Sequence, residues 1–231
     1  MFDLVIKDCS VMMPDFSIKE RQDILISNSL IAEIVNTGKH YDSKEIICGK
    51  NKLVMPGFID GHTHTCQQLL RGRTANEYPM VWTRILVPYE SSLTPEDCYF
   101  SAKLACLEMI KSGTTAFAES GSTHMADVVE AVIESGMRAS IARSTMDIGN
   151  SIPDSMKESA EMNILHTEEL YDKYQGTGEG RIDIWFAIRQ VMTCSPELIK
   201  EIGVEAKRLK YRDSCTIMMN HKGVNVSFCL Q

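Results

Sequence analysis

The sequence lacks any apolar run of the roughly 20 residues that a membrane-spanning helix needs. Its first residues, Met1 to Leu4, lack the basic start and long apolar core of a signal peptide. No basic stripe is present, and a net charge of −7 disfavours a nucleic-acid partner. None of the eight cysteines forms a Cys-x-x-Cys pair, which is typical of reduced thiols in a cytosolic protein. These absences predict a cytoplasmic protein without a membrane or nucleic-acid partner.

The pattern of apolar residues changes near Pro56. Residues 1–55 contain short β-branched runs and predict a small all-β unit of about five strands. Residues 56–231 alternate strands with helices, which is typical of βαβ units and a parallel sheet. We expect strands at 58–64, 114–119, 138–143, 182–188 and 215–219, and helices at 94–110, 125–134, 155–174 and 196–209.

This alternation fits either an open doubly wound sheet or a closed eight-stranded barrel. An open nucleotide-binding sheet usually has a glycine-rich phosphate loop after its first strand. Here that position holds His62-Thr63-His64-Thr65-Cys66, which cannot cradle a phosphate. In a parallel barrel, catalytic groups lie at the carboxyl ends of the strands, where this run is placed.

His62 and His64 are the strongest candidate metal ligands. Side chains alternate along a strand, so two histidines separated by one residue point to the same face and can share one ion. A catalytic zinc typically takes three protein ligands and activates water at an open position. The alternative is a strand that carries two polar residues on one face without binding a metal.

The other four histidines are weaker candidates. His221 follows the fifth predicted strand and has the best position for a further ligand. His124 follows the second strand and could face the site, or could cap a helix. His40 lies in a polar loop and His166 in a predicted helix, so both are expected on the surface.

Three charged residues end other predicted strands. Glu119 ends the second strand and could approach the metal site or support it from behind. Arg143 and Arg189 end the third and fourth strands, where a guanidinium could bind a carboxylate or polar ring of a substrate. A structural salt bridge is the alternative for each arginine.

Several motifs resemble the amidohydrolase superfamily, in particular its metal-dependent deaminases and chlorohydrolases. The matching segments are 56–64 (PGFIDGHTH), 69–72 (LLRG), Trp82 with 88–90 (PYE), 107–115 (LEMIKSGTT) and 136–139 (GMRA). The resemblance implies a (β/α)8 barrel, here residues 56–231, beside a small β-sandwich segment, residues 1–55. It implies a small-molecule substrate, namely hydrolytic deamination of an aminated heterocycle or nucleoside-type compound, with a divalent metal, zinc or alternatively iron. It also implies metal binding by His62 and His64 and substrate binding by Trp82.

The sequence departs from this family's pattern near its fifth strand. A His-x-x-Glu motif is expected there, but Met218 takes the histidine's place and His221 takes the glutamate's. A small register change would make His221 a metal ligand. Val81 and Arg189 replace a glutamate and a histidine of the adenosine-type enzymes, which puts nucleoside specificity in doubt.

The length predicts an incomplete barrel. Removing residues 1–55 from 231 leaves 176, whereas a complete barrel takes about 250. About five strands leave an exposed inner face, so we expect a homo-oligomer or a missing C-terminal half. Two alternatives to deamination remain: hydrolysis of a cyclic amide or chloride on the same scaffold, and a degenerate, non-catalytic fragment.

Overall fold

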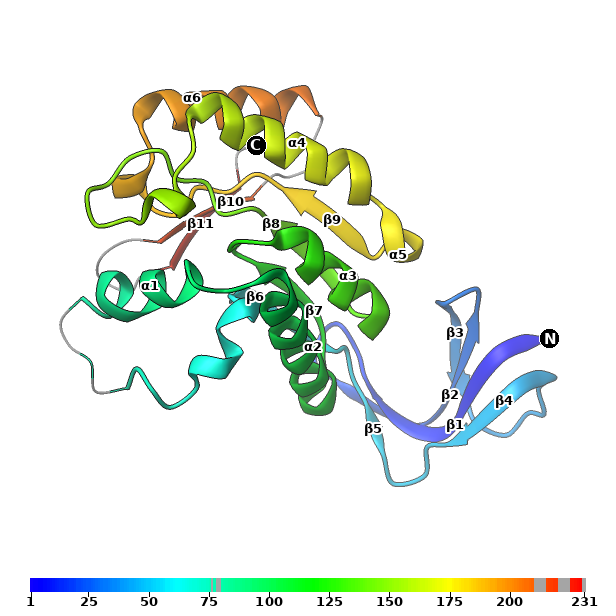
Figure 1. The fold of residues 1–231 in the computed structure, drawn as a ribbon. Helices are drawn as coiled ribbons and strands as arrows, with labels where there is room; N and C mark the ends of the chain where they lie inside the picture. The colour runs from blue at the N-terminus through cyan, green and yellow to red at the C-terminus, as the bar shows by residue number, and fades with distance from the viewer. Residues whose placement is uncertain (76, 78–79, 210–214, 220–224, 230–231) are drawn as a thin grey trace. The chain divides into compact units, whose positions relative to one another are not determined.

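The computed structural model describes residues 1–75, 77, 80–209, 215–219 and 225–229 (Figure 1). The chain divides into two compact units, Met1–Gly57 and Phe58–Gln231. In the described part of the chain, no helix is both long and apolar enough to cross a membrane.

The first unit is a mixed β-sheet with the strand order β3-β2-β1-β4, and β5 also pairs with β1. Antiparallel pairs join β1 to β2 and β2 to β3, whereas β4 and β5 run parallel to β1. Cys9, Val11 and Ile24 form its buried apolar cluster. The predicted all-β unit of about five strands is therefore confirmed. The strands are β1 (Phe2–Met12), β2 (Ile18–Ser27), β3 (Leu30–Asn36), β4 (Ser43–Cys48) and β5 (Leu53–Val54).

The second unit contains a parallel sheet with the strand order β6-β7-β8-β9, which confirms the βα alternation. A helix lies between each pair of successive strands in the chain, as parallel pairing requires of a crossover connection. Buried residues of α2 (Pro95–Ser112), α3 (Met125–Ser135) and the sheet strands form one apolar core. The strands are β6 (Phe58–Thr63), β7 (Thr114–Glu119), β8 (Arg138–Ala142) and β9 (Ile182–Trp185).

Local capping explains where the long helices begin and end. Thr94 and Asp97 form a capping box at the start of α2 (Pro95–Ser112), and Gly113 ends it with a φ of 84°. Ser159 and Ser195 cap α4 (Ala160–Tyr174) and α6 (Pro196–Arg208). The remaining helices and turns are α3 (Met125–Ser135), α1 (Val87–Glu90), α5 (Thr177–Gly180), η1 (Thr65–Leu70), η2 (Trp82–Leu86), η3 (Asp154–Met156) and η4 (Val191–Thr193).

The structure corrects three predicted boundaries or pairings. The helix predicted from residue 155 begins at Ala160, because Ser159 accepts a hydrogen bond from the Met162 amide. The strand predicted to reach residue 188 ends at Trp185. The strand expected to be fifth in the parallel sheet, β10 (Cys215–Met219), pairs instead with β11 (Asn225–Cys229) in an antiparallel hairpin. Closing such a short loop costs less conformational entropy than a long parallel crossover.

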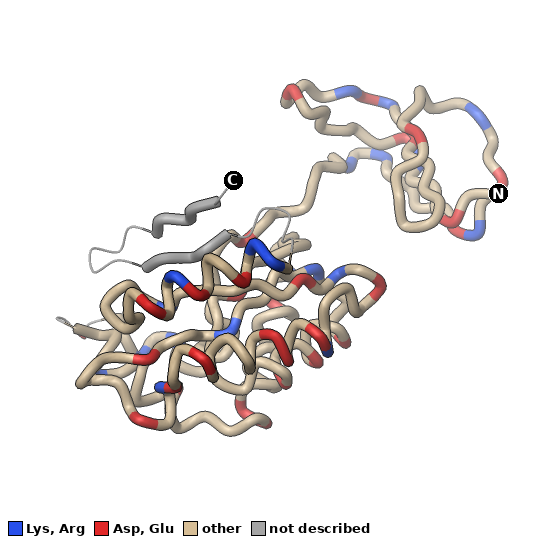
Figure 2. The backbone as a smooth tube through the Cα atoms, turned by 90° about the horizontal axis from the view of Figure 1, so that it is seen from above, with Lys and Arg blue, Asp and Glu red and all other residues tan. Residues whose placement is uncertain are grey.

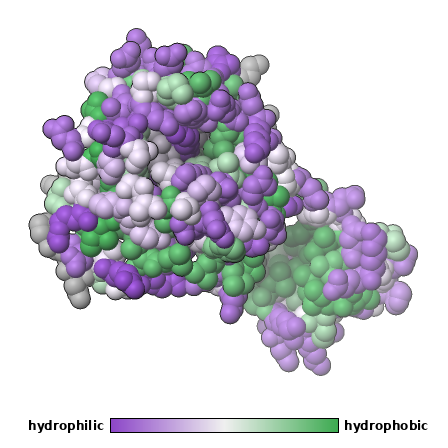
Figure 3. Space-filling view, viewed as in Figure 1, coloured by the Kyte–Doolittle hydropathy of each residue, from purple (hydrophilic) through white to green (hydrophobic). Residues whose placement is uncertain are grey.

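One face of the parallel sheet carries a hollow of about 290 Å³, lined by residues of all four strands, including Ile59, Ala116, Ala139 and Trp185. Ile59 is 76% exposed and the adjacent Phe58 is 58% exposed. Charged residues of both signs are interspersed along the helices of this unit (Figure 2), and the face in Figure 3 mixes hydrophilic and hydrophobic residues. The predicted homo-oligomer or missing C-terminal half stays a prediction.

Candidate metal centre

The two histidines lie side by side at the carboxyl end of β6. His62 is within the strand and His64 follows its last residue with an extended backbone, φ −124° and ψ 91°. Alternation therefore continues through His64. The ring centroids are 5.2 Å apart, with an angle of 89° between the ring planes.

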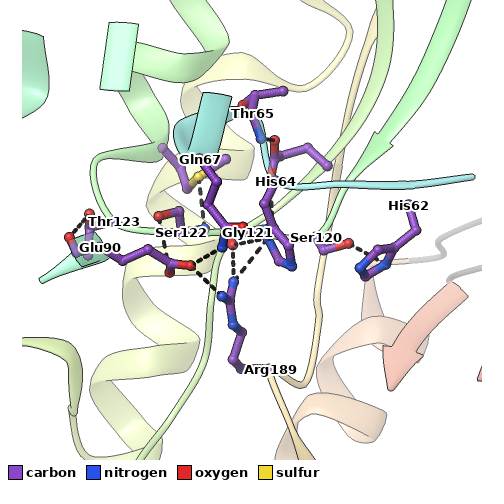
Figure 4. Close-up of polar contacts among 12 residues, drawn as sticks. His62, His64, Thr65, Gln67, Glu90, Ser120, Gly121, Ser122, Thr123 and Arg189 are labelled. Carbon is purple, nitrogen blue, oxygen red and sulfur yellow. Dashed lines mark hydrogen bonds and ion pairs between the residues drawn. The ribbon is translucent and has the colours of Figure 1, made fainter. Parts of the chain in front are cut away.

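His62 has one ring nitrogen held and the other without a partner. Its Nδ1 lies 2.7 Å from Oγ of Ser120, as Figure 4 shows. Its Nε2 is buried and has no hydrogen-bond partner among the described residues. Burial and the positive charge of Arg189 lower the pKa of His62, which favours the neutral ring with one nitrogen lone pair.

His64 is more deeply enclosed by polar groups. Its Nδ1 lies 3.1 Å from the carbonyl oxygen of Gly121 and 3.1 Å from Nη1 of Arg189. Burial lowers the pKa of His64 well below 6.5, and the charge of Arg189 adds to this effect. The ring therefore carries a single proton at neutral pH.

Glu119, the last residue of β7, forms hydrogen bonds to the segments that follow β6 and β7, next to His64. Its side chain is 1% exposed and accepts hydrogen bonds from the amides of Thr65, at 2.8 Å, and Gly121, at 3.0 Å. Its Oε1 lies 3.9 Å from Nδ1 of His64. Burial raises the pKa of Glu119 to about 7. The backbone hydrogen bonds indicate that Glu119 holds the loops that carry His64.

The raised pKa of Glu119 predicts a pH-dependent stability. Because the folded pKa of about 7 exceeds the ordinary 4.5, protonated Glu119 favours the fold. This stabilisation is complete below pH 4.5 and is lost as the pH rises through 7. The free energy of unfolding of the metal-free protein should fall by about 3 kcal/mol over that range relative to Glu119→Gln. Urea unfolding at a series of pH values measures this; parallel curves for the two proteins would contradict it.

A buried ion pair lies next to His64 (Figure 4). Nη2 of Arg189 lies 2.6 Å from Oε1 of Glu90, and these side chains are 2% and 0% exposed. Nη1 of Arg189 donates to the carbonyl of Gly121 at 2.5 Å. Glu90 also accepts hydrogen bonds from Gln67 and, at 3.4 Å, from Ser122. These described contacts of Arg189 are with protein groups; the substrate-binding role predicted for it stays a prediction.

Sequence reasoning did not single out Glu90, Ser120 or Gly121. Glu90 belongs to the Pro88-Tyr89-Glu90 motif, but nothing local signals its burial. Ser120 directly follows Glu119 at the carboxyl end of β7, so strand order could have placed it near His62. The role of Gly121 depends on its backbone carbonyl, which no residue pattern reveals.

A polar cavity of about 310 Å³ adjoins this network and shares Ser122 with it. Arg143 lines the cavity and is held by Glu158, at 2.8 Å, and by Asn163, at 3.3 Å. The hydroxyl of Ser144, also at the cavity, is buried without a hydrogen-bond partner in the described structure. Such a cavity could bind a small polar ring.

Trp82, predicted to bind substrate, packs against an apolar cluster of Val87, Met146, Ile152 and Met156. Met146 and Met156 also line the polar cavity. The indole Nε1 of Trp82 is buried and has no hydrogen-bond partner among the described residues. Its predicted role stays a prediction.

The other histidines do not join the pair within the described structure. Nε2 of His124 lies 3.0 Å from the carbonyl of Leu93, and Nδ1 of His166 lies 3.0 Å from Glu158. His40 is an exposed residue of the first unit. His221, predicted as a metal ligand, lies outside the described residues.

The described residues fit part of a metal site. The unpartnered Nε2 of His62 and the adjacent ring of His64 are suitable nitrogen donors. Within residues 1–209, apart from 76 and 78–79, no group of three or more histidine, cysteine, aspartate or glutamate side chains is arranged to hold a metal. A catalytic zinc typically takes three protein ligands, which is one more than this pair of histidines provides.

Residues 53–212 match the model of the amidohydrolase family. A 5-methylthioadenosine/S-adenosylhomocysteine deaminase of Carboxydothermus hydrogenoformans is 35% identical over 210 residues, which are 89% of this chain and 46% of that protein. The chain therefore spans about half the length of the curated relatives it matches.

Solved structures confirm the fold. An adenosine deaminase from Xanthomonas campestris with bound zinc has a TM-score of 0.81 and 23% identity, covering 94% of this chain and 48% of its own. A zinc complex of atrazine chlorohydrolase from Arthrobacter aurescens has a TM-score of 0.80 and 21% identity, covering 90% and 51%. The parallel sheet and its helices match half of such a barrel, which confirms the predicted incomplete (β/α)8 fold. This chain belongs to the amidohydrolase family and is homologous to its deaminases.

Proposed function

We propose that His62 and His64 supply two ligands to a catalytic divalent cation, zinc or alternatively iron. The cation would serve hydrolytic deamination of an aminated heterocycle or nucleoside-type substrate. The observation that carries this proposal is the buried Nε2 of His62, which has no hydrogen-bond partner among the described residues and lies beside the ring of His64. A buried polar atom without a partner costs free energy, and a cation would satisfy it.

In this reaction, the side chains of this chain would bind the substrate and orient the ligand rings. A bound cation supplies Lewis acidity and activates water as the nucleophile. Ser120 orients the ring of His62 through its Nδ1, and Nδ1 of His64 lies against Gly121 and Arg189. The polar cavity beside Ser122 would hold the substrate ring, with Arg143 directed by Glu158 and Trp82 close by. Its volume is at the lower end of small-molecule sites, which favours a compact substrate.

The homology to a 5-methylthioadenosine/S-adenosylhomocysteine deaminase supports deamination as the reaction. The remaining ligand and proton-transfer groups would come from His221 or other residues outside the described structure, or from another chain. The test is ammonia release from a panel of aminated purines, pyrimidines and nucleosides with zinc present. Release from none of them would contradict the proposal.

Zinc binding tests the ligand roles directly. His62→Ala removes one of two described donors, so the affinity for zinc should fall at least tenfold. His40→Ala is the matched control because His40 is exposed in the other unit, and its affinity should equal that of the wild type. Calorimetric titration measures both. Equal affinities for all three proteins would place the zinc elsewhere.

A hydrolase acting on a cyclic amide or a chloride is a second candidate, favoured by the structural match to atrazine chlorohydrolase. A non-catalytic fragment is a third, favoured by the lack of a third ligand within the described residues. Chloride release, ring opening or ammonia release distinguishes the reactions. If zinc binds the wild-type protein no more tightly than it binds His62→Ala, the non-catalytic alternative is favoured.

A further inference from the structure

The contact between Arg189 and His64 bears on which ring nitrogen of His64 is free. A guanidinium has only donors and stays charged, so any hydrogen bond that it makes to Nδ1 of His64 needs a lone pair there. Nη1 of Arg189 lies 3.1 Å from that nitrogen. The guanidinium is fixed at its other side by Glu90, at 2.6 Å, and has little freedom to turn away.

The carbonyl of Gly121 offers the alternative partner for Nδ1. That carbonyl already accepts a hydrogen bond from Nη1 of Arg189 at 2.5 Å. A proton on Nδ1 would therefore point toward a carbonyl that already accepts a hydrogen bond from Arg189. It would also lie close to a second donor, because Nη1 of Arg189 is 3.1 Å from Nδ1. A charge-assisted hydrogen bond from Arg189 to an unprotonated Nδ1 is about twice as strong as a neutral one. A second positive charge on the ring, this close to a buried guanidinium, would be unfavourable.

We propose that Arg189 is a positioning residue that holds His64 in the tautomer with its proton on Nε2. The Nε2 lone pair of His64 is then withheld from a cation until Arg189 moves off Nδ1. The two histidines differ in this respect. The Ser120 hydroxyl beside Nδ1 of His62 can either donate or accept a hydrogen bond, so it fixes neither tautomer of His62. The consequence for the cation rests on the proposed function, whereas the tautomer itself does not.

The hydrogen bonds around Arg189 hold its guanidinium in place beside His64. Glu90 is fully buried, and Gln67 and Ser122 also donate to its carboxylate. Arg189 would have to leave a buried carboxylate in order to release His64. The chain therefore sets metal affinity at His64 through a residue 125 positions away.

Nitrogen-15 NMR of the histidine rings in the metal-free protein tests the tautomer without any change to the network. His64→Gln and His62→Gln identify which signals belong to each ring. We expect Nδ1 of His64 to be unprotonated and Nε2 to carry the proton. A proton on Nδ1 of His64 in the wild-type protein would overturn the proposal, whatever the protein's affinity for zinc.

The double variant Glu90→Gln/Arg189→Gln tests the cause. It removes both buried charges together and keeps groups able to form hydrogen bonds, and circular dichroism checks that it folds. His64 should shift toward the Nδ1-protonated tautomer, with zinc binding at least tenfold tighter by calorimetry. The matched control, Glu168→Gln/Arg208→Gln, removes an Arg–Glu pair on α4 and α6 and should change neither.

The two proposals fail in different ways. An unchanged tautomer in the folded double variant would overturn the role of Arg189. A shifted tautomer without any zinc binding would leave that role standing and contradict the proposed metal centre. If the double variant does not fold, the wild-type tautomer decides the proposal alone.

Discussion

Replacement of Glu90 by alanine should lower the free energy of unfolding by about 3–5 kcal/mol, because it leaves the buried charge of Arg189 without its partner. Both side chains of the pair are almost fully buried, so water cannot take over the role of the carboxylate. Hydrogen bonds from Gln67 and Ser122 would be lost at the same time. Urea unfolding followed by circular dichroism measures the change.

Two control variants distinguish the effect of a buried unpaired charge on stability from the effect of losing an ion pair. Glu108→Ala removes an exposed partner of Arg71 and should leave the unfolding midpoint nearly unchanged. Glu90→Leu/Arg189→Met removes both buried charges and should be much less destabilising than Glu90→Ala. A Glu90→Ala protein as stable as the wild type would show that the guanidinium is solvated, which contradicts the described packing.

Gly121→Ala should be destabilising by about 2–5 kcal/mol. Gly121 has a φ of 88°, which costs about 1–2 kcal/mol for a residue with a Cβ. That Cβ would also lie 2.4 Å from the amide nitrogen of Ser144 and 2.7 Å from the carbonyl carbon of Arg143. Both are backbone atoms, so relief requires the segments that follow β7 and β8 to shift apart, at a further cost of about 1–3 kcal/mol. The thermal midpoint and the urea midpoint should both fall.

Gly136→Ala is the matched control for this prediction. Gly136 has a similar φ of 76°, but its Cβ would meet no atom within 4 Å. Only the conformational cost remains, about 1–2 kcal/mol. Equal losses for the two variants would contradict a close approach at Gly121. The difference between them isolates the contact that aims the Gly121 carbonyl at His64 and Arg189.

Much of the fold could be predicted because its signals are local. The start of α2 depends on Thr94, Pro95 and Asp97, and its end on Gly113, all within one helix. Helix and strand periods, capping and glycine at a left-handed position act over a few residues. The boundaries that differed are places where a specific contact overrides periodicity. Ser159 caps the helix that begins at Ala160, and beyond Trp185 the Ala187 carbonyl accepts a hydrogen bond from the Thr145 hydroxyl.

The pairing of β10 could not be predicted in the same way. Its residues favour a strand, but a strand pattern does not name its neighbour. In the structure β10 pairs with β11 rather than extending the sheet β6 to β9. Partner choice depends on loop closure and on which sheet edge is available, and neither is a local property.

The sequence by itself determined the parallel βα architecture and the placement of His62 and His64 on one face, since strand alternation has a period of two. Only the tertiary structure decided what surrounds those rings. Arg189 lies 99 positions from Glu90 in the chain, yet the two meet in a buried pair beside His64. Such contacts depend on how distant loops pack and exclude water, because burial turns a solvated charge into one that needs a specific partner.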